Sequence, residues 1–230
     1  MIAPSPAAGP ASGLAEQETL DELRLRLAPL VAANAAFDGW STDAVTLAAD
    51  QAGVDRDIAQ FAFDGGAMAM IEAWFATVDA AMLARCAPEA LAALKIRARI
   101  TMLVEARLAI LAPHREALRR AQSILAMPRN LAAASRLGWR AADHIWRAAG
   151  DTAVDYNHYS KRALLGSIYA ATLLMLVQDE SEDFAETRAF LARRIEGVMR
   201  FEKAKARLTG GADRHFSLAR FVGRLRYRGH

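Results

Sequence analysis

The chain has 230 residues and a formal net charge of +3, which is too small to mark a nucleic-acid-binding protein by itself. Hydrophobic residues make up 53% of it but aromatic residues only 7%, and the frequent alanines favour packed helices over a sheet of β-branched and aromatic residues. A single cysteine, Cys86, excludes an internal disulfide framework and indicates a reducing compartment such as a bacterial cytoplasm. We therefore predict an all-α protein.

Residues 1–18 are rich in Pro, Ala, Gly and Ser, and they predict a disordered lead. They lack the basic start and continuous apolar run of a secretory signal, and they lack the arginines of a mitochondrial presequence. The longest apolar run without a charge, residues 163–177, is shorter than the roughly 20 residues needed to cross a bilayer. We therefore expect neither a targeting segment nor a membrane span.

Residues 19–75 predict three short helices. Apolar residues recur every three or four positions from Leu20 to Val31, which indicates a first amphipathic helix, and Gly39 then breaks the chain. Ser41 or Thr42 caps a second helix, Gly53 ends it in a tight turn, and a third helix begins near residue 54 or 55. Three short helices around a glycine turn are typical of a helix-turn-helix, as in the TetR-type repressors.

The third of these helices, VDRDIAQFAF, has the wrong charge for reading DNA. Phosphate neutralisation supplies most of the affinity for a duplex, yet from Asp38 to Glu72 the only basic residue is Arg56. We therefore expect a degenerate helix-turn-helix that acts as a structural cap, with no nucleic-acid partner. A TetR-like transcriptional regulator that senses a lipid stays open as the alternative, and it would require duplex binding despite the acidic helix.

Longer helices are predicted over residues 76–209. Pro88 fits a first helical position before an apolar-periodic run over 89–111, Pro113 breaks the chain, and Pro128 marks the next start. A helix over about 129–149 ends at Gly150, and a strongly apolar helix follows over about 159–176. Because that helix is apolar nearly all round, we expect it to be buried centrally, within a filled core or beside a lipid-sized cavity.

The last long helix and the C-terminus carry two further predictions. Asp183 and Glu186 are spaced for reciprocal capping of a helix whose inner stripe holds apolar residues, namely Phe184, Leu191, Ile195 and Val198. Residues 210–230 predict a hinge at Gly210 and Gly211 and then an amphipathic helix over about 216–227. The predicted membrane-binding residues are an apolar stripe and flanking arginines: Leu218, Arg220, Phe221, Val222, Arg224, Leu225 and also Arg226.

Such a short basic helix is suited to reversible binding in a bilayer interface, because its stripe reaches acyl chains while its arginines meet anionic headgroups. The alternative is a terminal helix that packs on its own domain or on a partner subunit.

An ordered series of motifs runs through residues 142–195. It comprises Trp146, Ala149, Gly150, Asp151, Asp155, Asn157, Tyr159, Lys161, Arg162, Ile168, Tyr169, Thr172, Asp179, Ser181, Phe190, Leu191, Arg193, Arg194 and Ile195. This series resembles the Coq-nine family of ubiquinone-biosynthesis accessory proteins, whose members are lipid-binding and have a TetR-like fold. One position departs from the pattern, since many relatives carry Trp where this chain has His158.

The resemblance implies a docking patch for the di-iron hydroxylase that acts on the demethoxy quinone precursor, formed by Ile145, Trp146, Asp155, Tyr156, His158 and Tyr159. It also implies lipid-binding residues on the apolar helix: Leu165, Ile168, Tyr169, Thr172 and Leu176. The same residues have structural explanations. Trp146 and Tyr159 are suited to packing, Asp151 to a helix cap, and Lys161 with Arg162 to a solvated helix face.

No catalytic residue, metal site or cofactor is predicted, because the five histidines are scattered and neither a phosphate loop nor a nucleophile elbow is present. The resemblance therefore implies a non-enzymatic accessory protein that binds an isoprenoid quinone precursor or phospholipid at the membrane surface and presents it to the hydroxylase. We expect it in the cytoplasm, peripherally associated with a bacterial inner membrane. A homodimer follows by analogy with TetR-like frames.

Overall fold

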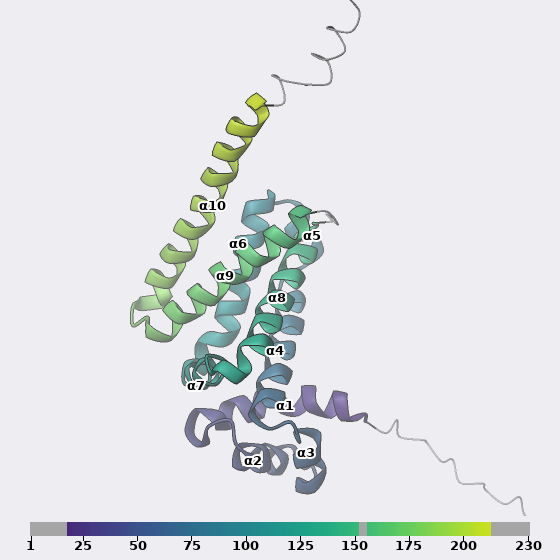
Figure 1. Cartoon of the computed structure of the whole chain (residues 1–230). Helices are drawn as coiled ribbons and strands as arrows, with labels where there is room; N and C mark the ends of the chain where they lie inside the picture. The colour runs from purple at the N-terminus through teal and green to yellow at the C-terminus, as the bar shows by residue number, and fades with distance from the viewer. Residues whose placement is uncertain (1–17, 152–155, 213–230) are drawn as a thin grey trace, which may run out of the picture. The chain divides into compact units, whose positions relative to one another are not determined.

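The computed structural model describes residues 18–151 and 156–212 (Figure 1). Over these residues the chain forms helices and no strand, which confirms the predicted all-α class. The helices are α1 (Leu20–Asp38), α2 (Thr42–Ala52), α3 (Arg56–Ala62), α4 (Gly66–Arg85), α5 (Pro88–Ala92), α6 (Ile96–Leu111), α7 (Arg115–Leu125), α8 (Leu131–Ala148), α9 (Tyr156–Gln178) and α10 (Ala185–Ala212). The chain divides into two compact units, residues 1–74 and 75–230, and α4 begins in the first and ends in the second.

The first unit is the predicted three-helix segment. The Ser41 hydroxyl accepts from the Ala44 N–H at the start of α2, and Gly53 ends that helix in the left-handed region at φ 66°. The Asp55 carboxylate caps α3. These caps confirm the helix boundaries that the sequence predicts. The boundaries are predictable because each helix start depends on a neighbouring side chain and the end of α2 depends on a neighbouring glycine.

The core of the first unit is built from small and branched side chains. Leu27, Val31 and Ala48 are completely buried where α1 packs against α2, and α3 packs against both helices. The Trp40 and Trp74 rings lie 5.3 Å apart between centroids. The guanidinium of Arg24 donates to the Ala62 carbonyl, which ties the end of α3 to α1.

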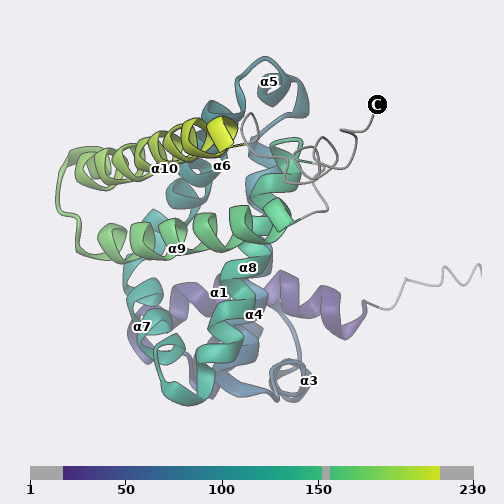
Figure 2. The same cartoon turned by 45° about the horizontal axis from the view of Figure 1, so that its top comes forward.

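The second unit is arranged around α9. Helix α9 packs against α8 on one side and α10 on another, and α6 contacts α8, α9 and α10 (Figures 1 and 2). Helix α7 contacts α8 and α9. The prediction that α9 is buried all round is wrong, since Leu164 is 38% and Leu174 is 55% exposed. Neighbouring helices cover only part of its circumference.

The prediction of a single helix over residues 89–111 is also wrong. Helix α5 ends at Ala92, Lys95 is extended, and α6 begins at Ile96. The Arg99 side chain donates to the carbonyls of Ala92, Leu94 and Ala149, at 3.1, 2.8 and 2.9 Å. It therefore satisfies the carbonyls of Ala92 and Leu94, which a continuous helix over 89–111 would have bonded internally.

The start of α10 is capped differently from the prediction. Asp183 lies at φ 53° and forms no reciprocal cap with Glu186. The buried carboxylate of Asp179 instead accepts from the backbone N–H and the hydroxyl of both Ser181 and Thr187. Burial raises the pKa of Asp179, but these hydrogen bonds outweigh it and lower the pKa to about 2.

The inner stripe of α10 is confirmed at its centre, where Leu191 and Ile195 are buried, whereas Phe184 and Val198 are half-buried. The helix continues through Gly210 and Gly211 to Ala212, so the predicted hinge is wrong. A glycine weakens a helix by about 1 kcal/mol without having to end it. The predicted membrane-binding residues, 218–225, lie outside the described residues.

Two helices are long and apolar enough to cross a bilayer by length and composition alone, namely α4 and residues Tyr159–Gln178 of α9. The requirement for an apolar run without any charge was therefore too strict a criterion for a possible membrane-spanning helix. In each helix, 44% of the most apolar window is buried by other parts of the chain.

Candidate functional site

An apolar groove lies between α9 and α10. One part, of about 250 Å³, is lined by Ile96, Arg97, Ile100, Trp146, Ser160, Lys161, Leu164, Leu165, Ile168, Ile195 and Val198. A second part, of about 500 Å³, is lined by Leu164, Ser167, Ile168, Ala171, Arg193, Arg194, Gly197 and Val198. The two parts share Leu164, Ile168 and Val198, so they are continuous, and we call them together the α9/α10 groove.

The groove combines apolar walls with cationic side chains. Leucine, isoleucine and valine side chains supply its walls, and the charged residues that line it are Arg97, Lys161, Arg193 and Arg194. The guanidinium of Arg194 lies 4.8 Å from the centroid of the Phe190 ring. Because none of the described residues that line the groove is a carboxylate, the groove is suited to an amphipathic molecule with a long apolar part and an anionic or oxygen-rich head.

A buried polar brace holds the α8 side of the groove. Arg162 of α9 is 1% exposed, and it bonds Asp143 at 2.5 Å and Asp151 at 3.3 Å. Lys161 bonds Asp151 at 2.7 Å, and the Trp146 indole N–H donates to the Lys161 carbonyl at 3.1 Å. The explanation of Lys161 and Arg162 as a solvated face is therefore wrong for Arg162, and Asp151 joins helices instead of only capping one.

The brace also sets the charge state of its carboxylates. Burial raises the pKa of Asp143, but the hydrogen bond from Arg162 and the charge of Arg147 outweigh it. Burial likewise raises the pKa of Asp151, and Lys161 and Arg162 reverse this effect. Both carboxyl groups therefore have pKa values below their usual range and are ionised at neutral pH.

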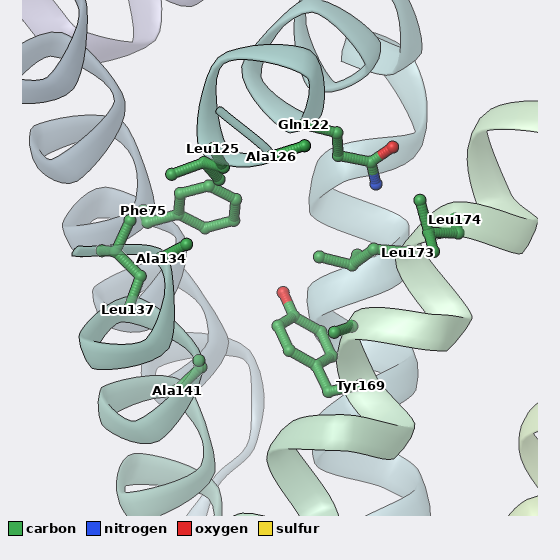
Figure 3. A pocket seen from close by; sticks show the side chains of 12 residues that line it. Phe75, Gln122, Leu125, Ala126, Ala134, Leu137, Ala141, Tyr169, Leu173 and Leu174 are labelled. Atoms are coloured by element: carbon green, nitrogen blue, oxygen red, sulfur yellow. The ribbon is translucent and has the colours of Figure 1, made fainter. Parts of the chain in front are cut away.

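A separate cavity lies on another side of α9, bordered by residues of α4, α7 and α8 (Figure 3). It has a volume of about 260 Å³, and its lining is almost entirely apolar. Figure 3 shows the Tyr169 ring reaching from α9 into the space that Phe75 borders from α4, with Gln122 on the α7 side. We call it the α8/α9 cavity.

Tyr169 connects this cavity to a buried ion pair. Arg107 of α6 is completely buried, bonds Asp79 of α4, and donates through Nε to the Tyr169 hydroxyl at 3.0 Å. Arg140 and His144 of α8 lie 3.4 and 3.3 Å from the same carboxylate. Burial raises the pKa of Tyr169, although Arg107 opposes the effect. This cluster joins four helices around Asp79.

The buried ion pair of Arg107 and Asp79 is not among the predicted site residues, yet the sequence contains a signal for it. Arg107 stands three residues after Val104 and four before Leu111, which are both buried. Asp79 stands similarly between Phe75 and Met82. A charged residue at a core position of an apolar stripe indicates a buried partner of opposite charge.

A third cavity, of about 800 Å³, lies among α4, α6, α9 and the start of α10. Cys86, Met102 and Leu176 line it, and burial raises the pKa of the Cys86 thiol. Charged side chains of both signs border this cavity, because arginines and carboxylates both contribute to its lining.

The predicted lipid-binding residues are divided among these sites. Leu165 and Ile168 line the α9/α10 groove, Tyr169 lines the α8/α9 cavity, and Leu176 lines the third cavity. Thr172 is completely buried and donates to the Ile168 carbonyl. Residues spaced along one helix therefore face different cavities, because α9 has packed helices on more than one side.

Only some residues of the predicted docking patch lie at the surface of the protein. Ile145 is completely buried, so its inclusion is wrong: it faces inward from α8. Trp146 is half-buried and lines the groove, whereas Tyr159 is 61% exposed. The Tyr159 ring lies 5.9 Å from that of Trp139, which the sequence analysis did not select. Asp155 and the side chains of residues 156–158 lie outside the described part of the chain.

The residues that the structure describes contain no group of three or more His, Cys, Asp or Glu side chains placed to hold a metal ion.

Comparison with known proteins supports the predicted resemblance. Residues 131–202 match the COQ9 family model. The human protein "Ubiquinone biosynthesis protein COQ9, mitochondrial" is 42% identical over 96 residues, which are 42% of this chain and 30% of the human protein. The Drosophila melanogaster COQ9 protein is 23% identical over 200 residues, 85% of this chain and 61% of that protein. The human match thus spans less than a third of that relative's length.

The fold is similar to that of a solved regulator. The crystal structure of a TetR transcriptional regulator from Nitrosomonas europaea has a TM-score of 0.60 and 24% sequence identity, and the match covers 76% of this chain and 96% of that one. At this identity the likeness concerns the fold alone. The chain therefore carries a COQ9 family domain over residues 131–202, within an all-α fold similar to that of the TetR regulators.

Proposed function

We propose that the chain is a non-enzymatic accessory protein of ubiquinone biosynthesis, which holds an isoprenoid quinone precursor in the α9/α10 groove. The observation that carries the proposal is the groove itself, with its apolar walls and its cationic side chains. The relatives that share residues of this segment are named ubiquinone biosynthesis proteins, and the domain that matches their family supplies α8, α9 and the first part of α10.

The energetics favour a tail in the groove. Burying a methylene group contributes about 0.8 kcal/mol, so an isoprenoid tail gains affinity with each unit that leaves water. An apolar wall provides this affinity without selecting a tail length. Arg97, Lys161, Arg193 and Arg194 offer hydrogen-bond donors to ring oxygens or to the headgroup of a phospholipid.

We further propose that the groove faces a docked hydroxylase. Tyr159 and Trp139 form an exposed aromatic pair, and Tyr159 directly precedes Ser160 and Lys161, which line the groove. Exposed aromatic side chains are frequent anchors at protein interfaces. A partner seated on this pair would therefore meet the groove where a quinone ring enters or leaves.

The proposed setting is a membrane surface. Residues 210–230 would bind reversibly to the inner membrane of a bacterium from its cytoplasmic side. The relatives named above are mitochondrial proteins. A homodimer is proposed from the TetR-like frame.

Lipid extraction tests the proposal. The full chain is purified without detergent, and its bound lipids are identified by mass spectrometry against an unrelated helical protein from the same cells. Enrichment of isoprenoid quinones or their precursors is expected. A protein free of lipid, or one that carries every cellular lipid in proportion to its abundance, would contradict the proposal. A gel shift with genomic fragments separates the alternative, a lipid-sensing regulator, which must bind a specific duplex.

A further inference from the structure

The surface of the first unit carries exposed apolar side chains among carboxylates. On α3, Ile58 is 52% exposed and Phe61 is 62% exposed, and on α2 Leu47 is 43% exposed. The Gln60 side chain donates to the Thr46 hydroxyl at 3.2 Å, which joins the outer sides of the two helices. We call the surface formed by Asp43, Leu47, Asp50, Asp57, Ile58, Phe61 and Asp64 the α2/α3 face.

The charge of the α2/α3 face is negative and largely uncompensated. Arg56 is the only basic residue between Asp38 and Glu72, and both of its bonds, at 2.7 and 2.9 Å, go to the carboxylate of Asp50. Asp43, Asp57 and Asp64 are exposed and form no ion pair with the described residues. The field in front of the apolar side chains is therefore negative.

The combination of exposed apolar side chains and negative charge favours some binding partners of the α2/α3 face over others. A DNA duplex and an anionic membrane would both be repelled by the carboxylates. A second copy that presents the same face would place like charges opposite each other, which is unfavourable. An amphipathic helix with an apolar stripe and flanking lysines or arginines matches both features, because its stripe covers Leu47, Ile58 and Phe61 while its cations meet the aspartates.

We propose that the α2/α3 face binds a basic amphipathic helix of a partner protein. The surface that a TetR-type regulator presents to DNA would here serve protein recognition. The side chains involved are exposed and do not pack in the core, so they are free to be replaced without loss of the fold. This proposal is independent of the lipid groove.

The test uses the full chain and a fluorescently labelled synthetic peptide of roughly 18 residues, with leucines at helical spacing and lysines elsewhere. Fluorescence anisotropy is expected to show saturable binding that weakens as salt is raised from about 0.05 to about 0.5 M. Phe61→Ser is expected to weaken binding about tenfold, as loss of a central aromatic contact does. Asp57→Asn is expected to weaken it and to reduce its salt dependence.

Matched controls remove a similar group elsewhere. Leu131→Ser changes a residue of α8 that is 53% exposed, and Glu89→Gln changes an exposed acid of α5. Both should leave peptide affinity unchanged, and Phe61→Ser should leave the melting temperature and the bound lipid unchanged.

Four results would overturn the proposal: no binding of the lysine peptide, equal binding of a peptide with glutamates in place of lysines, equal losses in the control variants, or duplex binding to this face. Sedimentation adds a further decisive outcome. If Phe61→Ser turns a dimer into a monomer, the face holds a second copy and the proposed partner is wrong.

Discussion

Two glycines offer a way to block one cavity of the second unit at a time. Gly197 of α10 lines the α9/α10 groove, and Gly138 of α8 lines the α8/α9 cavity. A Cβ atom added at either position would meet nothing within 4 Å. Gly197→Leu and Gly138→Leu are therefore matched changes, since each places the same side chain into open space on a helix.

The two changes should differ in lipid binding but not in stability. Leucine in a helix interior is favoured over glycine by about 0.8 kcal/mol, so both variants should melt at or slightly above the temperature of the unchanged protein. In Gly197→Leu the added carbons take the place of about four tail carbons. At about 0.8 kcal/mol for each, the loss is about 3 kcal/mol, or roughly 100-fold in affinity. Gly138→Leu should change the affinity less than about threefold.

Titration of each purified variant with a short-tailed ubiquinone analogue, followed by tryptophan fluorescence, measures the affinity, and thermal unfolding followed by circular dichroism measures stability. Trp146 lines the groove and serves as a local reporter. If Gly138→Leu loses binding while Gly197→Leu retains it, the tail lies in the α8/α9 cavity. If both retain full binding, neither cavity holds it, and the reasoning from the groove is refuted.

Three further predictions concern stability and docking. Arg107→Met should destabilise the protein by about 3 kcal/mol in chemical denaturation, because it leaves a buried carboxylate without its main partner, whereas Arg200→Met at an exposed pair should leave the stability nearly unchanged; equal losses of stability would refute the buried pair. The folded-state pKa of Asp179, about 2, lies below the ordinary value of 3.8. The contribution of this carboxylate to the free energy of unfolding is therefore complete above pH 3.8 and is lost as the pH falls through about 2. Asp179→Asn should therefore be about 2 kcal/mol less stable at neutral pH, and urea unfolding across pH should show the difference closing in acid; a constant difference would contradict this. Tyr159→Ala should weaken hydroxylase binding about tenfold or more in calorimetry and leave lipid content unchanged, and a parallel loss of lipid would point to a packing role.

The helix boundaries that the sequence predicts correctly are those set by neighbouring residues. Ser41, Gly53 and Asp55 each act within a few positions of their own place in the chain. The break between α5 and α6 could not be predicted in this way, because its carbonyls are satisfied by Arg99, which also bonds Ala149, fifty residues away in sequence. A long-range hydrogen bond leaves no local signal.

Family motifs located the groove region but not the direction of each side chain. Ile145 and Tyr159 both belong to the predicted docking patch, yet one is completely buried and the other is 61% exposed. The rotation of α8 and of α9, each about its own axis, decides which side chains face inward, and it depends on packing across the whole interface. The motif residue Arg162 shows the same limit, since its burial requires Asp143 of α8.

The apolar composition of α9 predicted burial without showing what surrounds the helix. A filled core and a cavity require the same leucines and isoleucines, and the difference is a matter of the space between helices. The structure shows cavities on more than one side of α9, so the predicted lipid-binding residues could not all face one ligand. Asp79 and Arg107, by contrast, could have been found, because both are charged residues at core positions.

The central claim is that the α9/α10 groove holds the tail of a quinone precursor, and photo-crosslinking tests it most directly. A quinone analogue with a diazirine in its tail is bound to the full chain and irradiated, and the labelled peptides are mapped by mass spectrometry. The account predicts labels on Leu164, Ile168 and Val198, which both parts of the groove share. Labels concentrated on Phe75, Leu137 and Leu173 of the α8/α9 cavity, or no specific label, would contradict it.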